Sequence, residues 1–208
     1  MTFVARNTGG DFTPAPQGTH IARCVQLIDL GTQYSEFYKK SARKLLVGWE
    51  LPGEKKPDTD DVFLVWKRYT LSLSDNAHLR RDLEGWRGKK FTAEELQAFD
   101  VLKVLGHGCL LSIVHDERDG TKYTNVQSVS ALTKGTKCPE RINDLLEFDV
   151  DNPNWEAFNL LSERLQETIN NSAERKAATA AADARTEPTG QGEDDLQRQM
   201  EEADDIPF

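Results

Sequence analysis

Apolar and polar residues alternate along the first half of the chain in a way that is typical of β-strands. Three segments carry this pattern and are rich in β-branched and apolar residues: 20–30, 44–51 and 62–73. Residues that favour turns, such as Gly31 and the pair Pro52-Gly53, follow the first two. The third segment is long enough to need a bulge or a bend. We therefore predict three consecutive strands.

The period then changes to about 3.6 residues, which indicates a helix. Its apolar residues lie at i, i+4 and i+7, and a glycine follows at the C-cap position: Leu79, Leu83, Trp86 and Gly88. Thr92 and Glu95 have the spacing of a capping box, so we predict a second, shorter helix. Residues 109–115 and 122–132 indicate two further strands, joined by a hairpin turn at Asp119-Gly120.

This order of elements predicts the fold class. Five short strands with a helix between the third and the fourth is the order of the OB-fold, a five-stranded Greek-key barrel that often binds single strands or oligosaccharides. An unrelated five-stranded α+β domain can give the same order. We predict a mainly β protein with an OB-fold domain over residues 18–141. Residues 1–17, rich in Gly, Pro and Thr, are expected to form a flexible arm.

A further helix is predicted after the barrel, within residues 142–170. Asn152-Pro153 has the character of an N-cap followed by proline at the first helical position. One face is then apolar: Trp155, Phe158, Leu161, Leu165 and Ile169. This face packs either on the barrel or on a partner subunit in a homodimer. Residues 171–208 lack aromatic residues before Phe208, so we expect a disordered acidic tail.

The charge is distributed unevenly between the body and the tail. The chain has 26 Lys and Arg residues against 35 Asp and Glu, a net charge of -9 that would argue against a nucleic-acid partner. Residues 1–141, however, carry 21 cations against 18 anions, whereas residues 142–208 carry 5 against 17. A mildly basic body at +3 with a tail at -12 leaves nucleic-acid binding by the body open.

Composition argues against several classes of protein. No window approaches the roughly 18 apolar residues of a membrane span, and residues 1–17 do not resemble a signal peptide. Three cysteines without paired spacing do not indicate a disulfide framework. We therefore expect a soluble, cytosolic protein. Neither a zinc motif, a phosphate loop nor a nucleophile elbow is present, so we predict no enzyme activity, no metal and no cofactor.

Aromatic residues and cations alternate in the link between the first two strands. Single-strand binding needs both, because bases stack on aromatic rings while cations contact the phosphates. The candidates in this link are Tyr34, Phe37, Tyr38, Lys39, Lys40, Arg43 and Lys44. The alternative is a surface loop with a small hydrophobic cluster.

The third strand separates into two faces by its period of two. Trp66 and Arg68 lie on the more polar face, so we assign them to the binding surface, whereas Tyr69 is expected in the core. A bulge near Lys67 would exchange these assignments. Trp49 shares a face with apolar residues of the second strand, which favours packing.

Cations and aromatics also occur in the last hairpin and on the first strand. Arg118, Lys122 and Tyr123 lie near the predicted hairpin tip and are secondary candidates for DNA contacts. Arg23 is a cation on an otherwise apolar strand. It either reaches the binding groove or pairs with a carboxylate such as Asp29.

The last residues combine acids with an apolar tip: Asp204, Asp205, Ile206, Pro207 and Phe208. A terminal aromatic residue with a free carboxylate is a suitable anchor for a pocket rimmed with cations. This ending closely resembles that of bacterial single-stranded DNA-binding proteins. The body is more similar to a family of phage-encoded relatives, through residues 18–33, 46–52, 69–73, 79–88 and 123–132.

The resemblance implies a barrel that coats single-stranded DNA during replication, recombination and repair. It also implies a tip that recruits polymerases, helicases or nucleases, and a location in the cytoplasm of a bacterial host. The hypothesis is therefore a DNA-binding protein with little sequence preference. An OB-like adaptor or inhibitor that binds only proteins is the alternative, and a nuclease that uses Asp58, Asp60 and Asp61 is a third.

Overall fold

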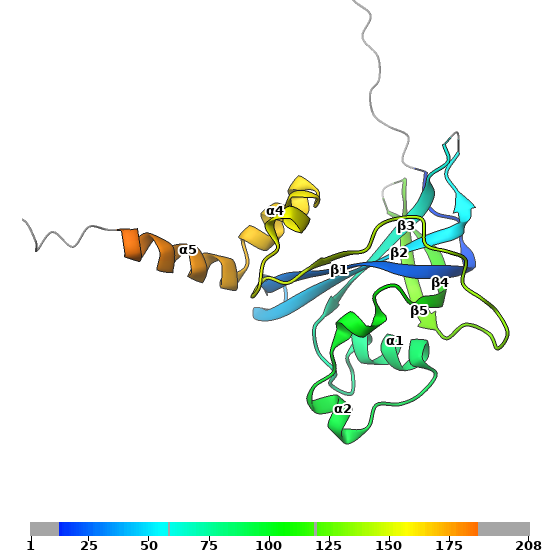
Figure 1. The fold of residues 1–208 in the computed structure, drawn as a ribbon, viewed down its shortest axis with the longest axis horizontal. Helices are drawn as coiled ribbons and strands as arrows, with labels where there is room; N and C mark the ends of the chain where they lie inside the picture. The colour runs from blue at the N-terminus through cyan, green and yellow to red at the C-terminus, as the bar shows by residue number, and fades with distance from the viewer. Residues whose placement is uncertain (1–12, 58, 119, 187–208) are drawn as a thin grey trace, which may run out of the picture.

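A computed structural model describes residues 13–57, 59–118 and 120–186 (Figure 1). Its strands are β1 (Gly18–Ser35), β2 (Lys40–Lys55), β3 (Val62–Thr70), β4 (Gly108–Arg118), β5 (Thr121–Ser130) and β6 (Leu146–Phe148). The helices are α1 (His78–Arg87), α2 (Ala93–Gln97), the 3₁₀ turn η1 (Val101–Val104), α3 (Trp155–Asn159), α4 (Glu163–Asn170) and α5 (Ala173–Thr186). The protein is therefore mainly β, as predicted.

One six-stranded sheet organises these elements. Its main path runs β3-β2-β1-β4-β5 with antiparallel neighbours, and the short β6 pairs in parallel with β1. β1 pairs with β4 through residues 18–23 and with β2 through residues 23–35, with register shifts after Cys24 and after Asp29. Such irregularities bend a strand, which allows β1 to pair with β4 along one part and with β2 along the other. The two end strands of this path, β3 and β5, also contact each other.

The larger hydrophobic core lies between the sheet and α1. The alternation along β2 places Leu45, Val47 and Trp49 in this core, and Trp49 is only 1% exposed, so its predicted packing role is confirmed. Leu83 and Trp86 of α1 fill the same core. The αL backbone of Gly88 (φ 66°) caps α1 as its sequence predicts.

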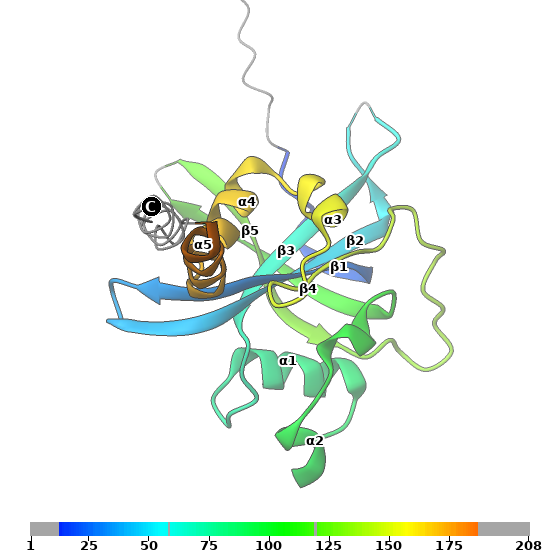
Figure 2. The same cartoon turned by 60° about the vertical axis from the view of Figure 1, so that its left-hand side comes forward.

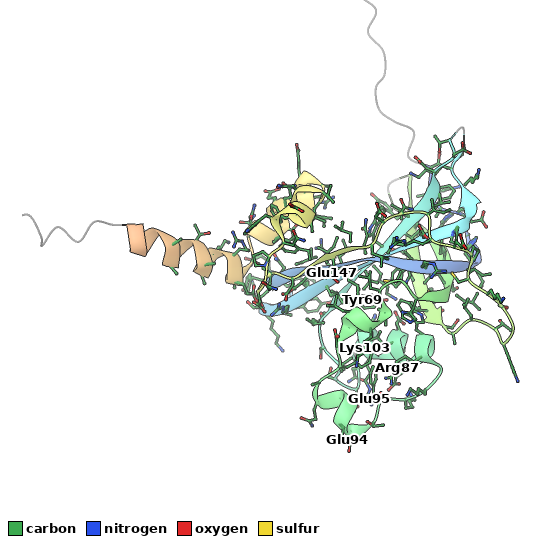
Figure 3. All side chains as sticks on the ribbon, in the orientation of Figure 1. Tyr69, Arg87, Glu94, Glu95, Lys103 and Glu147 are labelled. Atoms are coloured by element: carbon green, nitrogen blue, oxygen red, sulfur yellow. The ribbon has the colours of Figure 1, made fainter. Side chains whose placement is uncertain are left out.

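Helix α2 begins with the predicted capping box. The Thr92 side chain accepts from the Glu95 backbone N–H, and the Glu95 carboxylate accepts from the Thr92 backbone N–H. Arg87 of α1 forms an ion pair with Glu95, and Figure 3 labels both residues. This pair ties the two helices together below the sheet.

A second apolar cluster covers the opposite face of the sheet. Its residues come from β1, β2 and the C-terminal segment: Ile28, Leu30, Leu46, Phe148, Val150, Phe158, Leu161 and Ile169. The apolar face predicted for the segment after the barrel therefore packs on the sheet of the same chain. In Figure 2, α3 and α4 lie on one side of the sheet and α1 and α2 on the other.

The C-terminal segment differs from the prediction in its detail. The expected single helix is divided into α3 and α4, and its first N-cap is Asn154, whose side chain accepts from two backbone N–H groups. At the break, the Gln166 side chain donates to the carbonyls of Phe158 and Leu161. A helix break leaves backbone carbonyls without partners, and a side chain that donates to them lowers its energetic cost.

Two segments expected to lack structure are partly ordered. Ala173–Thr186 forms α5, because its alanines are strong helix formers and Glu174 accepts hydrogen bonds from the backbone and hydroxyl of Thr32. In the arm, Ala15 is buried and the carbonyl of Pro16 contacts the His20 ring. Residues 1–12 and 187–208 lie outside the described residues. Within the described ranges, no helix is long and apolar enough to cross a membrane.

Candidate functional site

Trp66 is the largest exposed aromatic side chain on β3. The period of two along β3 buries Phe63, Val65 and Tyr69 and leaves Trp66 46% exposed and Arg68 exposed, so the predicted faces are confirmed. Tyr69 donates to the buried carboxylate of Asp82 at 2.9 Å, which fixes the core face of the strand. The outer face is thus free to present an aromatic ring and a cation.

The indole of Trp66 is held in place by residues from two neighbouring strands. Register places Gly48 of β2 opposite Trp66, and a Cβ at Gly48 would lie 2.8 Å from the indole Cδ1 and Nε1. The missing side chain therefore leaves room for the ring to lie across β2. On the far side, the indole Nε1 donates to the Gln26 Oε1 of β1 at 2.7 Å. The ring is oriented before any ligand arrives.

Two grooves meet at this ring. The first, of about 580 Å³, lies between the β2–β3 turn, β3 and β5, and is lined by Lys56, Thr59, Leu64, Trp66, Tyr123 and Thr124 among others. The second, of about 410 Å³, lies between the sheet and the C-terminal segment, and is lined by Gln26, Leu46, Trp66, Arg68, Leu160 and Arg164 among others. Because Trp66 lines both, an extended ligand could follow one continuous path. We name this path the Trp66 groove.

The cations of the groove differ in their surroundings. Among the described residues, no carboxylate pairs with Arg68. The pKa of Arg68 is lowered, because nearby protein atoms partly remove water from it and because Arg164 carries a like charge. Lys56 lies 3.8 Å from the exposed Asp61, a distance at which a surface pair contributes little. The groove therefore offers positive charge for an anionic ligand.

Tyr123 and Lys122 lie at the end of the first groove, on β5. Tyr123 is 48% exposed and lines the groove with Lys56, while Lys122 is also exposed. The predicted hairpin of β4 and β5 is confirmed by its antiparallel pairing. The side chain of Arg118, a secondary candidate, lies outside the described residues, as do Asp58 and the tip Asp204–Phe208.

The segment predicted as a link between the first two strands is a hairpin instead. Alternation continues through it, so that β1 and β2 pair as far as Ser35 and Lys40, and Lys39 in the turn has a φ of 49°. At its tip the aromatic side chains are the most exposed of those predicted: Tyr34 at 56%, Phe37 at 86% and Tyr38 at 72%.

The lysines of this hairpin are accessible. Lys39 pairs with Glu36 at 2.8 Å on the surface, Lys40 is exposed, and Lys44 donates to the Thr70 hydroxyl at 2.8 Å. Figure 2 shows the hairpin projecting beside α5, at the end of the sheet away from the β2–β3 turn. The hairpin tip is therefore separate from the first part of the Trp66 groove.

Arg43 has a structural role that its sequence context does not reveal. Its guanidinium forms ion pairs with Asp29 of β1 and, at 2.7 Å and 3.5 Å, with Asp151 and Asp149 after β6. Hydrogen bonds to Asp29 and Asp151 raise the pKa of Arg43. An arginine held by three carboxylates is a poor ligand for phosphate, so we remove Arg43 from the candidate interface.

Arg23 also has structural contacts that its sequence context does not reveal. It donates to the backbone carbonyls of Gly106 at 2.6 Å and Pro139 at 2.5 Å. Gly106 lies in the loop before β4 and Pro139 in the loop after β5, so Arg23 connects these two loops. Arg23 does not line the Trp66 groove, and it forms no ion pair with a carboxylate in the part of the chain that the structure describes.

All three cysteines are free thiols. Burial raises the pKa of the Cys24 thiol to about 12 and that of Cys109 well above its usual value. Both are therefore protonated at neutral pH, which makes them poor nucleophiles. The described residues contain no cluster of three or more His, Cys, Asp or Glu side chains arranged to hold a metal ion.

Comparison with known proteins does not supply a family for this chain. No known protein family and no curated protein matches its sequence.

Proposed function

We propose that the protein binds single-stranded DNA along the Trp66 groove, without catalysis and with little sequence preference. One observation carries the proposal: the exposed indole of Trp66 is held by Gln26 over Gly48, beside Arg68, a cation that has no ion-pair partner among the described residues. A fixed aromatic surface next to a free cation is the pair of groups that a single strand needs. Stacking on such a ring contributes roughly 1–3 kcal/mol per base.

The path of the strand follows from the two grooves. Tyr123 and Lys56 offer a second aromatic ring and a second cation in the first groove, which Trp66 joins to the second. Every base has a face that can stack, whereas reading a base edge needs a dedicated set of polar groups. The groove is lined mainly by apolar and aromatic side chains, which favours stacking over sequence readout.

We further propose that the sheet is an OB-fold barrel. The helix α1 lies between β3 and β4, β1 pairs with both β2 and β4, and β3 contacts β5. In OB-folds, ligands bind on the face of strands 2 and 3 and near the loops that flank it. Trp66 and Arg68 of β3 lie on the outer face of this region.

The C-terminal tip, Asp204–Phe208, is proposed to recruit proteins of replication, recombination or repair in the cytoplasm of a bacterial host. This part of the proposal rests on the sequence and on its resemblance to bacterial and phage single-stranded DNA-binding proteins. The acidic tail can also compete with DNA for the cations of the body, because a tethered segment has a high effective concentration.

A titration of fluorescently labelled oligo-dT, followed by anisotropy at several salt concentrations, tests the proposed DNA binding. We expect saturable binding whose logarithm falls linearly with the logarithm of salt concentration, with a slope of about -0.7 per phosphate contact. Binding that is absent, or independent of salt, would rule out the DNA-binding role and favour the protein adaptor. Shortening of the labelled strand with Mg²⁺ would instead indicate a nuclease.

A further inference from the structure

Two arginines from distant parts of the chain face the same groove. Arg68 comes from β3 and Arg164 from the first turn of α4, and both line the second part of the Trp66 groove. Among the described residues, neither guanidinium has an ion-pair or hydrogen-bond partner. Glu163 and Glu167 lie near Arg164 on the same helix, yet neither forms an ion pair with it. The groove therefore holds two uncompensated positive charges.

The position of Arg164 is fixed by the packing of the C-terminal segment. Ile169 at the end of α4 is fully buried in the second apolar cluster, and Ser172 is fully buried against Gly31 of β1. A Cβ at Gly31 would lie 2.5 Å from that of Ser172, and Gly31 has a positive φ of 68°. The contact needs glycine on both grounds. Helix α4 is thus a firm second wall of the groove.

Placing two like charges together has an energetic consequence. Partial loss of water, followed by the like charge of Arg164, lowers the pKa of Arg68. Two guanidinium charges in one groove repel each other, which costs stability when no anion lies between them. An anion between the two would relieve this repulsion and accept hydrogen bonds from both planar donor groups.

The surroundings of the two arginines also suit a phosphate of a nucleic-acid strand. Ser162, the N-cap of α4, also lines the groove, and its hydroxyl makes no capping hydrogen bond. The N-terminus of α4 adds a partial positive charge. Trp66 lies in the same groove, at a place where a base attached to that phosphate could stack.

We propose that Arg68 and Arg164 together clamp one backbone phosphate of the strand whose base stacks on Trp66. The C-terminal segment is then part of the DNA site as well as a support for the sheet. This inference rests on the proposed function. It adds a residue, Arg164, that neither the sequence pattern nor the barrel alone would assign to DNA binding.

The test compares Arg164→Ala with Arg141→Ala in the full-length chain. Arg164 is exposed, so its removal is expected to leave folding intact, and Arg141 is an exposed arginine whose contact with Asp144 is long, at 3.8 Å. We expect Arg164→Ala to weaken oligo-dT binding about tenfold and to reduce the magnitude of the salt slope by about 0.7. Arg141→Ala should match the wild type.

A double variant tests whether the two arginines hold the same phosphate. If they do, the loss in Arg68→Ala, Arg164→Ala is smaller than the product of the two single losses, because the second change removes an interaction already broken. A loss in the double variant equal to that product would contradict a shared phosphate. Wild-type affinity and salt slope in Arg164→Ala, with weaker binding in Arg68→Ala, would overturn the clamp and leave the DNA-binding role in place.

Tripolyphosphate separates failure of the clamp from failure of the proposed function. It carries the phosphate chemistry without bases, and a ligand that binds the folded state raises the melting temperature. We expect tripolyphosphate to raise the melting temperature of the wild type and of Arg141→Ala but not of Arg164→Ala. If oligo-dT does not bind but this pattern holds, the site takes a free phosphate compound. If tripolyphosphate shifts no variant and oligo-dT does not bind, the clamp is wrong as well.

Discussion

Gly48 is the residue on which the orientation of Trp66 depends. The indole lies where a side chain at position 48 would be, and Gln26 fixes its Nε1 from the next strand. A ring held in this way loses little conformational freedom when a base stacks on it. The affinity that Trp66 contributes is therefore set partly by a residue with no side chain.

Replacing Gly48 with alanine is expected to weaken oligo-dT binding by roughly 1 kcal/mol, about fivefold, since the new methyl group displaces the indole from its position. The melting temperature should also fall, because the methyl group would lie 2.9 Å from the Gln26 Cβ of β1, so binding is measured well below it. Gly53→Ala is the matched control, since Gly53 is on the same strand with no atom within 4 Å of its Cβ position. Equal affinity of both variants in an anisotropy titration would contradict the role of Gly48.

For single residues, the sequence predicts which side chains lie on each face of a strand, but not which side chains of neighbouring strands contact each other. A period of two is enough to place Trp66 and Arg68 outside and Tyr69 inside, because the pleat of a strand is regular. The contact of Trp66 with Gly48 and Gln26 depends on the register of three strands. That register is set by bulges and turns that no local pattern encodes.

At the element scale, the β1–β2 hairpin and the C-terminal segment are joined by Arg43. Its guanidinium connects Asp29 on β1 with Asp149 and Asp151, which follow β6. The sequence places Arg43 among cations and aromatics, which suggests a DNA contact. Its carboxylate partners are far away in the sequence, so only the fold brings them together.

The Arg43→Ala change should therefore lower stability without removing the DNA site. Asp29 is buried, and the loss of its partner leaves a carboxylate with too few donors, at an expected cost of about 1–3 kcal/mol in the free energy of unfolding. Urea denaturation measures this cost, and oligo-dT binding below the melting temperature should stay near the wild-type value. A loss of affinity with unchanged stability would return Arg43 to the interface.

Helix boundaries show the same limit at this scale. Of the predicted apolar stripe, Phe158, Leu161 and Ile169 are buried, whereas Trp155 is exposed. The break between α3 and α4 depends on Gln166, whose side chain donates to carbonyls of the preceding residues. Likewise, α5 forms where composition predicts disorder, since Glu174 is anchored on Thr32. Such tertiary contacts override local preferences.

At the scale of the whole molecule, the sheet separates two tasks. One face packs on α1 and forms the larger core, while the other carries the second part of the Trp66 groove and the C-terminal segment that forms its wall. The mildly basic body and the acidic remainder of the chain fit this division, because positive charge is needed only where the DNA strand is proposed to bind. Binding and stability can therefore be changed independently.

Stacking of DNA on Trp66 can be measured by tryptophan fluorescence with a matched pair of variants. Trp66 and Trp155 are each 46% exposed, but Trp155 packs against Phe158 and Arg175 rather than lining the groove. We predict that oligo-dT quenches the fluorescence of Trp155→Phe as it does that of the wild type, and that Trp66→Phe loses most of this quenching. Equal quenching in Trp66→Phe and the wild type would contradict stacking on Trp66 and place the DNA elsewhere on the protein.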